Sequence, residues 1–365
     1  MTARSSPTRA LAGGALAVAA VLLIGPSLLW AQEAPERTER ERAELPPLTA
    51  AVSPEEALAA IKRRAKKILE ARREAWRLKS SGEFTQGVGY ETNPSNGTAH
   101  KGDTYVEESV YLLLSKKLSP TLDWSGTYSG NYLKYLDYGD GDYTDHTLTP
   151  AKLRWRPGKM WRVEGWSDVE YNYYPKGKDS TYRNWKITGR VRQNLFDTWY
   201  HQFQYEWFIR DYVTKMARDG GGADTRNTRL DRRHRLRYKV GTTVKKALLS
   251  VENEYYWNDS NDARTDFYDS QVYKVTSSAS GNVTKKLYVS GSYAFERKNY
   301  EHRTVTGIDA EARYDDKTTL SSSAIYTFND TWKVSPSLQF DHLGSNESTG
   351  EYDNMKYAFT VTASF

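Results

Sequence analysis

The last residues of the chain alternate between apolar and polar side chains. Tyr357, Phe359, Val361 and the terminal Phe365 share one parity, and mostly Ser, Thr and Lys residues share the other. A period of two places the two sets on opposite faces of a β-strand, so this strand has one apolar face. Such a face needs another sheet or lipid to cover it, because in water it would stay exposed.

The same alternation runs from Phe84 to the C-terminus and never returns to a helical period. Apolar residues of one parity recur strand by strand, with Ser, Thr, Asn, Gln and charged residues between them. Examples are Leu122, Trp124, Tyr128 and Tyr132; Trp199, Phe203, Tyr205 and Trp207; and Leu287, Val289, Tyr293 and Phe295. Repeated apolar-out, polar-in alternation is typical of strands in a transmembrane barrel.

The connections between these segments alternate in length. Short turns are expected at 119–120, 157–158, 195–197, 245–246, 285–286 and 329–330, and longer polar loops at 93–103, 137–143, 175–181, 212–229, 259–267, 299–311 and 344–353. This asymmetry favours an all-β fold, a transmembrane antiparallel up-and-down β-barrel over 84–365, with about 14 strands and two either way. A soluble β-sandwich is the alternative, but its turns would not alternate so regularly.

Composition supports the barrel and excludes other classes. The chain has 27 Tyr and 11 Trp, as expected for aromatic girdles at two membrane interfaces. It has no Cys, which excludes disulfides and thiolate metal sites. A formal net charge of +6, without a basic recognition patch, does not indicate a nucleic-acid partner.

The N-terminal region divides into three expected segments. Residues 1–31 read as a signal peptide, with Arg4 and Arg9 before an apolar stretch, and 32–52 as a disordered leader. Ser53 and Pro54 then begin an amphipathic helix over 53–80, which lies either on the periplasmic side or as a plug in the lumen. We therefore expect export to the outer membrane of a Gram-negative envelope.

Several fragments carry a resemblance to known families. The terminal aromatic strand, with Tyr357, Phe359, Val361 and Phe365, resembles the assembly signal that the barrel-assembly machinery recognises. The segments 89–94 (GYETNP) and 255–262 (YYWNDSND) resemble the outer-membrane β-barrel porin families. The chain is more distantly similar to the C-terminal barrel of surface lipoprotein assembly modifiers, but lacks their periplasmic helical repeats. The resemblance implies outer-membrane lipid and lipopolysaccharide as surroundings.

The polar parity defines a candidate lumen rich in charge. Its residues are Lys152, Arg154, Arg156, Arg162, Glu164, Asp168, Glu170, Lys186, Arg190, Arg192, Glu206, Arg210, Arg235, Arg237, Lys239, Glu252 and Glu254. Because basic and acidic strands are neighbours, cross-strand ion pairs could serve register alone. Alternatively, arginines left without a partner would select anions.

The sequence therefore predicts a narrow, porin-like channel for small hydrophilic solutes, with mild anion preference. One alternative is a non-conducting structural or interaction barrel whose outer loops bind a partner or surface glycan. Another is an export barrel for polysaccharide or surface lipoprotein. An enzyme is not expected, since none of the six His residues lies in a nucleophile or metal signature, and no cofactor is implied. His201 and His342 are expected on the outward face.

Overall fold

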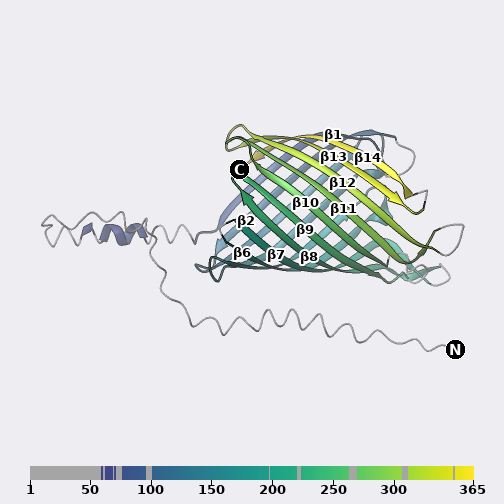
Figure 1. The fold of residues 1–365 in the computed structure, drawn as a ribbon, viewed down its shortest axis with the longest axis horizontal. Coiled ribbons are helices and arrows are strands. Elements are labelled where there is room, and N and C mark those ends of the chain that lie inside the picture. Colours follow the sequence, from purple (N-terminus) through teal and green to yellow (C-terminus); the bar gives the residue numbers. More distant parts are fainter. Residues whose placement is uncertain are drawn as a thin grey trace, which may run out of the picture. The chain divides into compact units, whose positions relative to one another are not determined.

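The alternating segments form fourteen β-strands in a closed barrel (Figure 1). The strands are β1 (Lys79–Glu91), β2 (Asp103–Lys117), β3 (Leu122–Tyr135), β4 (Tyr143–Trp155), β5 (Trp161–Tyr173), β6 (Tyr182–Leu195), β7 (Trp199–Arg218), β8 (Asp224–Val244), β9 (Ala247–Ser260), β10 (Ser270–Asn282), β11 (Leu287–Thr304), β12 (Ala312–Thr327), β13 (Trp332–Ser345) and β14 (Tyr352–Ser364). The up-and-down barrel of about 14 strands is thus confirmed.

The computed structural model describes 59–60, 62–68, 70, 76–95, 101–196, 198–219, 223–262, 269–305, 311–347 and 350–365, apart from the side chains of 301–304. It divides the chain into two units, Met1–Glu70 and Ala71–Phe365. In the first unit the backbone is helical at 59–60, 62–68 and 70, and Lys66 Nζ lies 4.0 Å from Glu70 Oε1. The expected signal peptide, leader and helix start lie outside the described residues.

Each strand pairs antiparallel with its neighbours in the chain, and β1 pairs with β14 to close the sheet. The terminal residue takes part in this closure. Gly82 N donates to Phe365 O at 2.8 Å, and Phe365 N donates back to Gly82 O at 2.9 Å. A closed sheet leaves no edge strand with unpaired backbone groups, which a lipid environment requires.

The two rims of the barrel carry different connections. The rim near Lys79 and Phe365, here called the termini rim, carries the short turns 118–121, 156–160, 196–198, 245–246, 283–286 and 328–331. The opposite loop rim carries 92–102, 136–142, 174–181, 219–223, 261–269, 305–311 and 346–351. All six expected short turns lie at the termini rim, so the inferred asymmetry is correct.

The bounds differ from expectation in two places. The range 212–229 is expected as a loop, but most of it belongs to β7 and β8. These two strands extend past the strands on either side and pair with each other there, with Met216 opposite Thr228. β1 begins at Lys79, five residues before the expected start, and takes the last two residues of the range assigned to the helix. Within the described part of the chain, no helix is long and apolar enough to cross a membrane.

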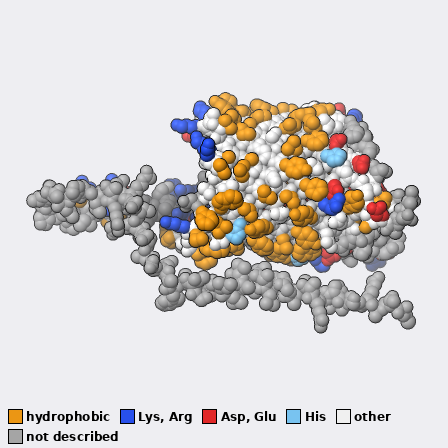
Figure 2. Space-filling view, viewed as in Figure 1, with side chains coloured by type: hydrophobic (Ala, Val, Ile, Leu, Met, Phe, Trp, Pro, Cys, Tyr) orange, Lys and Arg blue, Asp and Glu red, His pale blue; other side chains and the backbone are white. Residues whose placement is uncertain are grey.

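The barrel wall separates side chains by parity. On three neighbouring strands the outward residues Val169, Trp185 and Phe203 are 50%, 46% and 49% exposed. Their neighbours in sequence, including Asp168, Asn184 and Gln204, are buried on the other face. Figure 2 shows hydrophobic side chains over much of the visible wall. The face that would meet lipid is therefore apolar, as the sequence predicts.

Candidate functional site in the barrel lumen

The strand registers align five of the predicted charges with four further charged residues into a ladder around the lumen. Consecutive cross-strand partners from β3 to β12 are Asp123, Arg154, Glu164, Arg190, Gln204, Arg237, Glu254, Lys274, Glu296 and Lys317. Signs alternate along this series except at Gln204. Opposite-charge cross-strand pairs stabilise a sheet by roughly 0.2–1 kcal/mol each, so the ladder favours this register over a slipped one.

With one exception, the predicted luminal residues lie within strands β4–β9 on the inward parity, and we call them the charged wall. The exception is Arg156, which follows the end of β4. Its Nη1 donates to Asp123 Oδ2 at 2.6 Å, and its side chain is 44% exposed. Arg156 therefore belongs to the termini rim, because β4 ends one residue before it.

Glu164 on β5 is the centre of the charged wall near the termini rim. Its side chain is 1% exposed, and Arg154 Nε and Arg190 Nη1 donate to its two oxygens at 2.6 and 3.0 Å. Arg162 Nε lies 3.8 Å from Glu164 Oε1. One buried carboxylate thus holds two charge-assisted hydrogen bonds and a third nearby cation.

Trp166 points inward beside this cluster, although its residue type is usual on the outer face. Lys152 Nζ lies 4.4 Å and Arg190 Cζ 4.9 Å from the ring centroid. Trp166 Nε1 donates to Asp168 Oδ2 at 3.1 Å. The Trp166 ring lies close to both the Lys152 ammonium and the Arg190 guanidinium. Its cation–π attraction to them offsets part of the repulsion between the two cations. Its even parity on β5, shared with Glu164 and Asp168, was the available sequence signal.

Further along the same strands, two acids share one base and neutral hydrogen-bond donors. Lys186 Nζ binds Glu170 Oε1 and lies 3.7 Å from Asp168 Oδ2. Thr149 Oγ1 donates to Asp168 Oδ1 at 2.5 Å, and Asn184 Nδ2 donates to Glu170 Oε2 at 2.7 Å. These carboxylates are therefore engaged by neighbours, and this part of the wall serves strand packing.

Strands β7–β9 hold a balanced group. Arg235 Nη1 lies 3.0 Å from Glu206 Oε1, and Arg235 Nε lies 3.5 Å from Glu254 Oε1. Arg237 Nε donates to Glu254 Oε2 at 2.6 Å. Lys239 Nζ lies 3.8 Å from Glu252 Oε2. The predicted facing of these bases and acids across the hairpin is correct.

Arginines toward the loop rim contact aromatic rings. Arg210 Cζ lies 4.0 Å from the Tyr182 ring centroid, and Arg233 Cζ lies 4.9 and 4.7 Å from those of Phe208 and Tyr256. Their Nε atoms donate to Asn184 and Asn258 side-chain oxygens at 3.1 and 3.3 Å. No carboxylate of the described residues lies within 4.0 Å of either guanidinium.

Sequence reasoning missed three charged residues of β8 near the loop rim. Arg229 and Asp231 form a buried bidentate pair at 2.8 and 2.7 Å, and Arg233 lies two residues further on. The polar composition of 212–229 indicated a loop, so the first part of β8, which carries Arg229, was not recognised as a strand. Extending the parity of Arg235 back by two residues at a time would have found all three.

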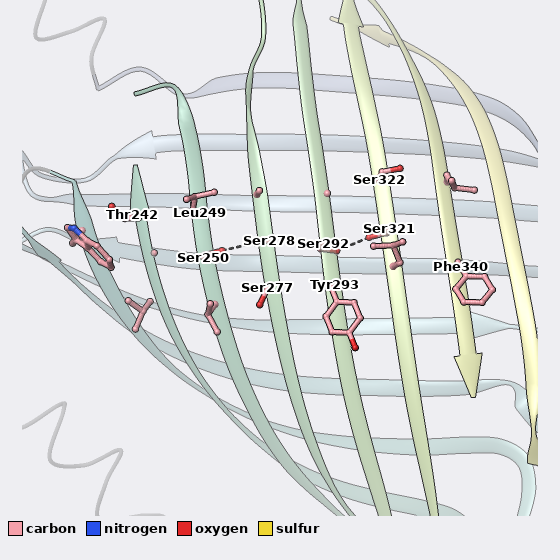
Figure 3. A pocket seen from close by; sticks show the side chains of 18 residues that line it. Thr242, Leu249, Ser250, Ser277, Ser278, Ser292, Tyr293, Ser321, Ser322 and Phe340 are labelled. Carbon is pink, nitrogen blue, oxygen red and sulfur yellow. Dashed lines mark hydrogen bonds between the residues drawn. The ribbon is translucent and has the colours of Figure 1, made fainter. Parts of the chain in front are cut away.

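The other side of the lumen carries paired hydroxyls. Ser250 and Ser278, Ser290 and Ser323, Ser292 and Ser321, and Thr85 and Thr362 form hydrogen bonds of 2.7, 2.8, 2.7 and 2.8 Å. We call these eight residues the hydroxyl wall. Figure 3 shows the links between Ser250 and Ser278 and between Ser292 and Ser321. This wall is polar without charge.

Two hollows adjoin these walls. One of about 700 Å³, shown in Figure 3, lies mainly on the outward face, where Leu249, Tyr293 and Phe340 surround the small side chains of Ser277 and Ser322. The other, of about 530 Å³, lies at the termini rim beside the charged wall. It is lined by Lys159, Met160, Arg192, Asn194, Phe196, Thr198, Trp199, Tyr200 and Thr243. Only the second hollow contains charged side chains.

The four histidines whose side chains the structure describes contact neighbouring side chains of the wall. His201 Nε2 lies 2.7 Å from Gln193 Oε1, and His342 Nδ1 lies 2.7 Å from Asp353 Oδ1. His146 and His234 contact the hydroxyls of Tyr128 and Tyr205 at 2.8 and 2.7 Å. Over the described ranges, no group of three or more His, Asp or Glu residues could hold a metal ion.

Comparisons with known proteins gave matches among solved structures only. No protein-family model matches the chain, and no curated protein matches it. A solved structure of outer-membrane expressed OmpT of Vibrio cholerae is similar at 9% identity, covering 80% of this chain and 98% of that one, with a TM-score of 0.49.

Two further solved structures are similar at comparable identity. OccAB3 of Acinetobacter baumannii has 8% identity, covers 79% of this chain and 100% of its own, and gives a TM-score of 0.40. The COG4313 outer membrane channel from Pseudomonas putida F1 has 11% identity, covers 80% and 98%, and also gives a TM-score of 0.40. At these values the likeness concerns the barrel fold alone.

Proposed function

We propose that the chain forms a narrow outer-membrane channel for small hydrophilic solutes, with a mild preference for anions. The apolar outer face supports placement in a bilayer, and the even strand number with short turns at the termini rim is the pattern of outer-membrane barrels. In this placement the termini rim and the N-terminal helix face the periplasm, and the loop rim faces lipopolysaccharide. The barrel-assembly machinery would recognise the terminal strand.

The observation that carries the anion preference is the excess of cations on the charged wall. Without Arg156, which lies at the termini rim, the predicted luminal set contains ten basic and six acidic residues. Arg192, Arg210 and Arg233 have no carboxylate within 4.0 Å among the residues that the structure describes, whereas Glu164, Glu206 and Glu254 each contact at least one base. The lumen therefore has uncompensated positive charge, which attracts anions.

A narrow lumen follows from strand number and side-chain length. Barrels of eight strands are filled by side chains, and those of sixteen or more leave aqueous channels, so fourteen strands are intermediate. Long side chains such as Arg210, Arg233 and Tyr256 project into this space. We therefore infer permeation of small solutes, without a wide pore.

Planar-bilayer recording tests this function. The purified full-length protein should insert with stepwise current increases, and liposomes containing it should admit small sugars but exclude large ones. Currents that stay at the baseline in several salts and at several voltages, with correctly folded protein verified by heat-modifiable migration, would overturn the proposal.

A further inference from the structure

The charged wall contains one rung where two like charges face each other. Arg162 on β5 and Arg192 on β6 are direct cross-strand partners. Like charges at directly opposed positions destabilise a sheet. Along the nearby ladder that contains Glu164 and Arg190, by contrast, the signs alternate except at Gln204. The nearest carboxylate, Glu164, already accepts hydrogen bonds from Arg154 and Arg190. Strand packing alone does not account for this pair.

Arg192 is held in place by neutral partners, whereas Arg162 lies beside a carboxylate. Arg192 Nε donates to Asn194 Oδ1 at 3.0 Å, and its Cζ lies 3.7 Å from the Tyr200 ring centroid. Arg162 Nε is buried without a hydrogen-bond partner and lies 3.8 Å from Glu164 Oε1. Neutral contacts fix the Arg192 side chain but leave its charge without a carboxylate within 4.0 Å among the described residues, so a binding anion would meet an ordered donor.

A cavity lies at this position. The hollow of about 530 Å³ at the termini rim is lined by residues that precede β5 and by residues in or next to β6, β7 and β8. It has Arg192 and Lys159 as its basic lining residues and Asn194, Thr198 and Tyr200 among its polar ones. No acidic residue of the described chain lines it. The volume is ample for a small solute group and water.

We propose that this hollow binds the oxyanion group of a small anionic solute, a phosphate-type or carboxylate-type group. The fork of a guanidinium matches two oxygens of such a group, which a spherical ion such as chloride does not offer. Arg192 supplies the fork and Lys159 a point charge, since both line the hollow, and Arg162 adds positive charge from the facing position on β5. This proposal deepens the channel function and rests on it, since the ligand is a permeating solute.

Isothermal titration of the detergent-solubilised full-length protein tests the site. Inorganic phosphate, acetate and chloride are titrated separately into wild type and into Arg192→Gln. Phosphate or acetate should bind more tightly than chloride, and Arg192→Gln should weaken that binding by roughly tenfold or more. The relative affinities for phosphate and acetate distinguish the two oxyanion types.

Lys239→Gln is the matched control. Lys239 and Arg192 pair with the same residue of β7, so they lie at the same level of the barrel wall, but Lys239 already has Glu252 beside it. The net charge change is the same, so Lys239→Gln should alter oxyanion affinity by less than about twofold. Equal losses in both variants would show general charge attraction and overturn the site. So would wild-type protein that binds chloride as tightly as the oxyanions.

A second readout keeps the proposal testable if one variant folds poorly. Oxyanion binding should raise the unfolding temperature of wild type and of Lys239→Gln, and should raise that of Lys159→Gln less, because Lys159 lines the hollow. Anion-selective conductance without oxyanion binding would refute this site and leave the channel standing. Oxyanion binding without conductance would refute the channel and leave a binding site at the rim.

Discussion

The charged wall and the hydroxyl wall line the same lumen by different means. On β4–β9, Arg, Lys, Glu and Asp side chains interlock at distances such as 2.6 Å between Arg154 and Glu164. On the other side, short hydroxyls pair at 2.7–2.8 Å, as between Ser292 and Ser321. The first wall combines structural ion pairs with an excess of cations, whereas the second is neutral. Selectivity should therefore depend on the first wall more than on the second.

The largest expected effect is at Glu164. Glu164→Gln removes the buried carboxylate that Arg154 and Arg190 share, and breaking a buried ion pair costs about 3–5 kcal/mol because its partners stay uncompensated. We expect the free energy of unfolding, measured by urea titration in detergent or lipid, to fall by about that amount. A loss below about 1 kcal/mol would mean that the cluster is not structural.

A steric test compares the backbone of two strands, β10 and β6. A Cβ on Gly281, on β10, would lie 2.5 Å from the backbone oxygen of Lys246, whereas one on Gly189, on β6, would meet nothing within 4 Å. Gly281→Ala should lower the free energy of unfolding by about 1–3 kcal/mol through overpacking. Gly189→Ala is the control, and equal costs in the two variants would contradict the close approach near β10.

Removing a hydroxyl should have a smaller effect. Ser292→Ala leaves the Ser321 hydroxyl to bond with luminal water, so unfolding free energy should change by less than about 1 kcal/mol. Ion selectivity should not change, because no charge is altered. A measurable shift in reversal potential for Ser292→Ala would contradict the assignment of ion selectivity to the charged wall.

The smallest effect belongs to a half-exposed ion pair. Lys239 and Glu252 are 28% and 26% exposed at 3.8 Å, so Glu252→Gln should cost less than about 1 kcal/mol. At 1 M salt, where the screening length is about 3 Å, this cost should vanish. A cost that persists in high salt would show that the pair acts through packing.

The sequence predicted the barrel because period-two alternation and turn asymmetry are both local. The parity of Glu164, Arg190 and Arg235 also placed their side chains on the inner face. It failed at 212–229, where a polar composition typical of loops belongs to two strands paired with each other beyond the rest of the barrel. Inside the wall, parity could not show that Arg162 faces Arg192 or that Trp166 lies between cations, since these depend on register.

The reversal potential in a KCl gradient tests the central claim most directly. The charged wall has more bases than acids, and the hydroxyl wall is neutral. We therefore predict that the measured reversal potential is displaced from zero toward the equilibrium potential of chloride. Replacing Arg192, Arg210 and Arg233 together by Gln should move it toward zero. A wild-type channel that favours potassium, or shows no preference, would contradict the account.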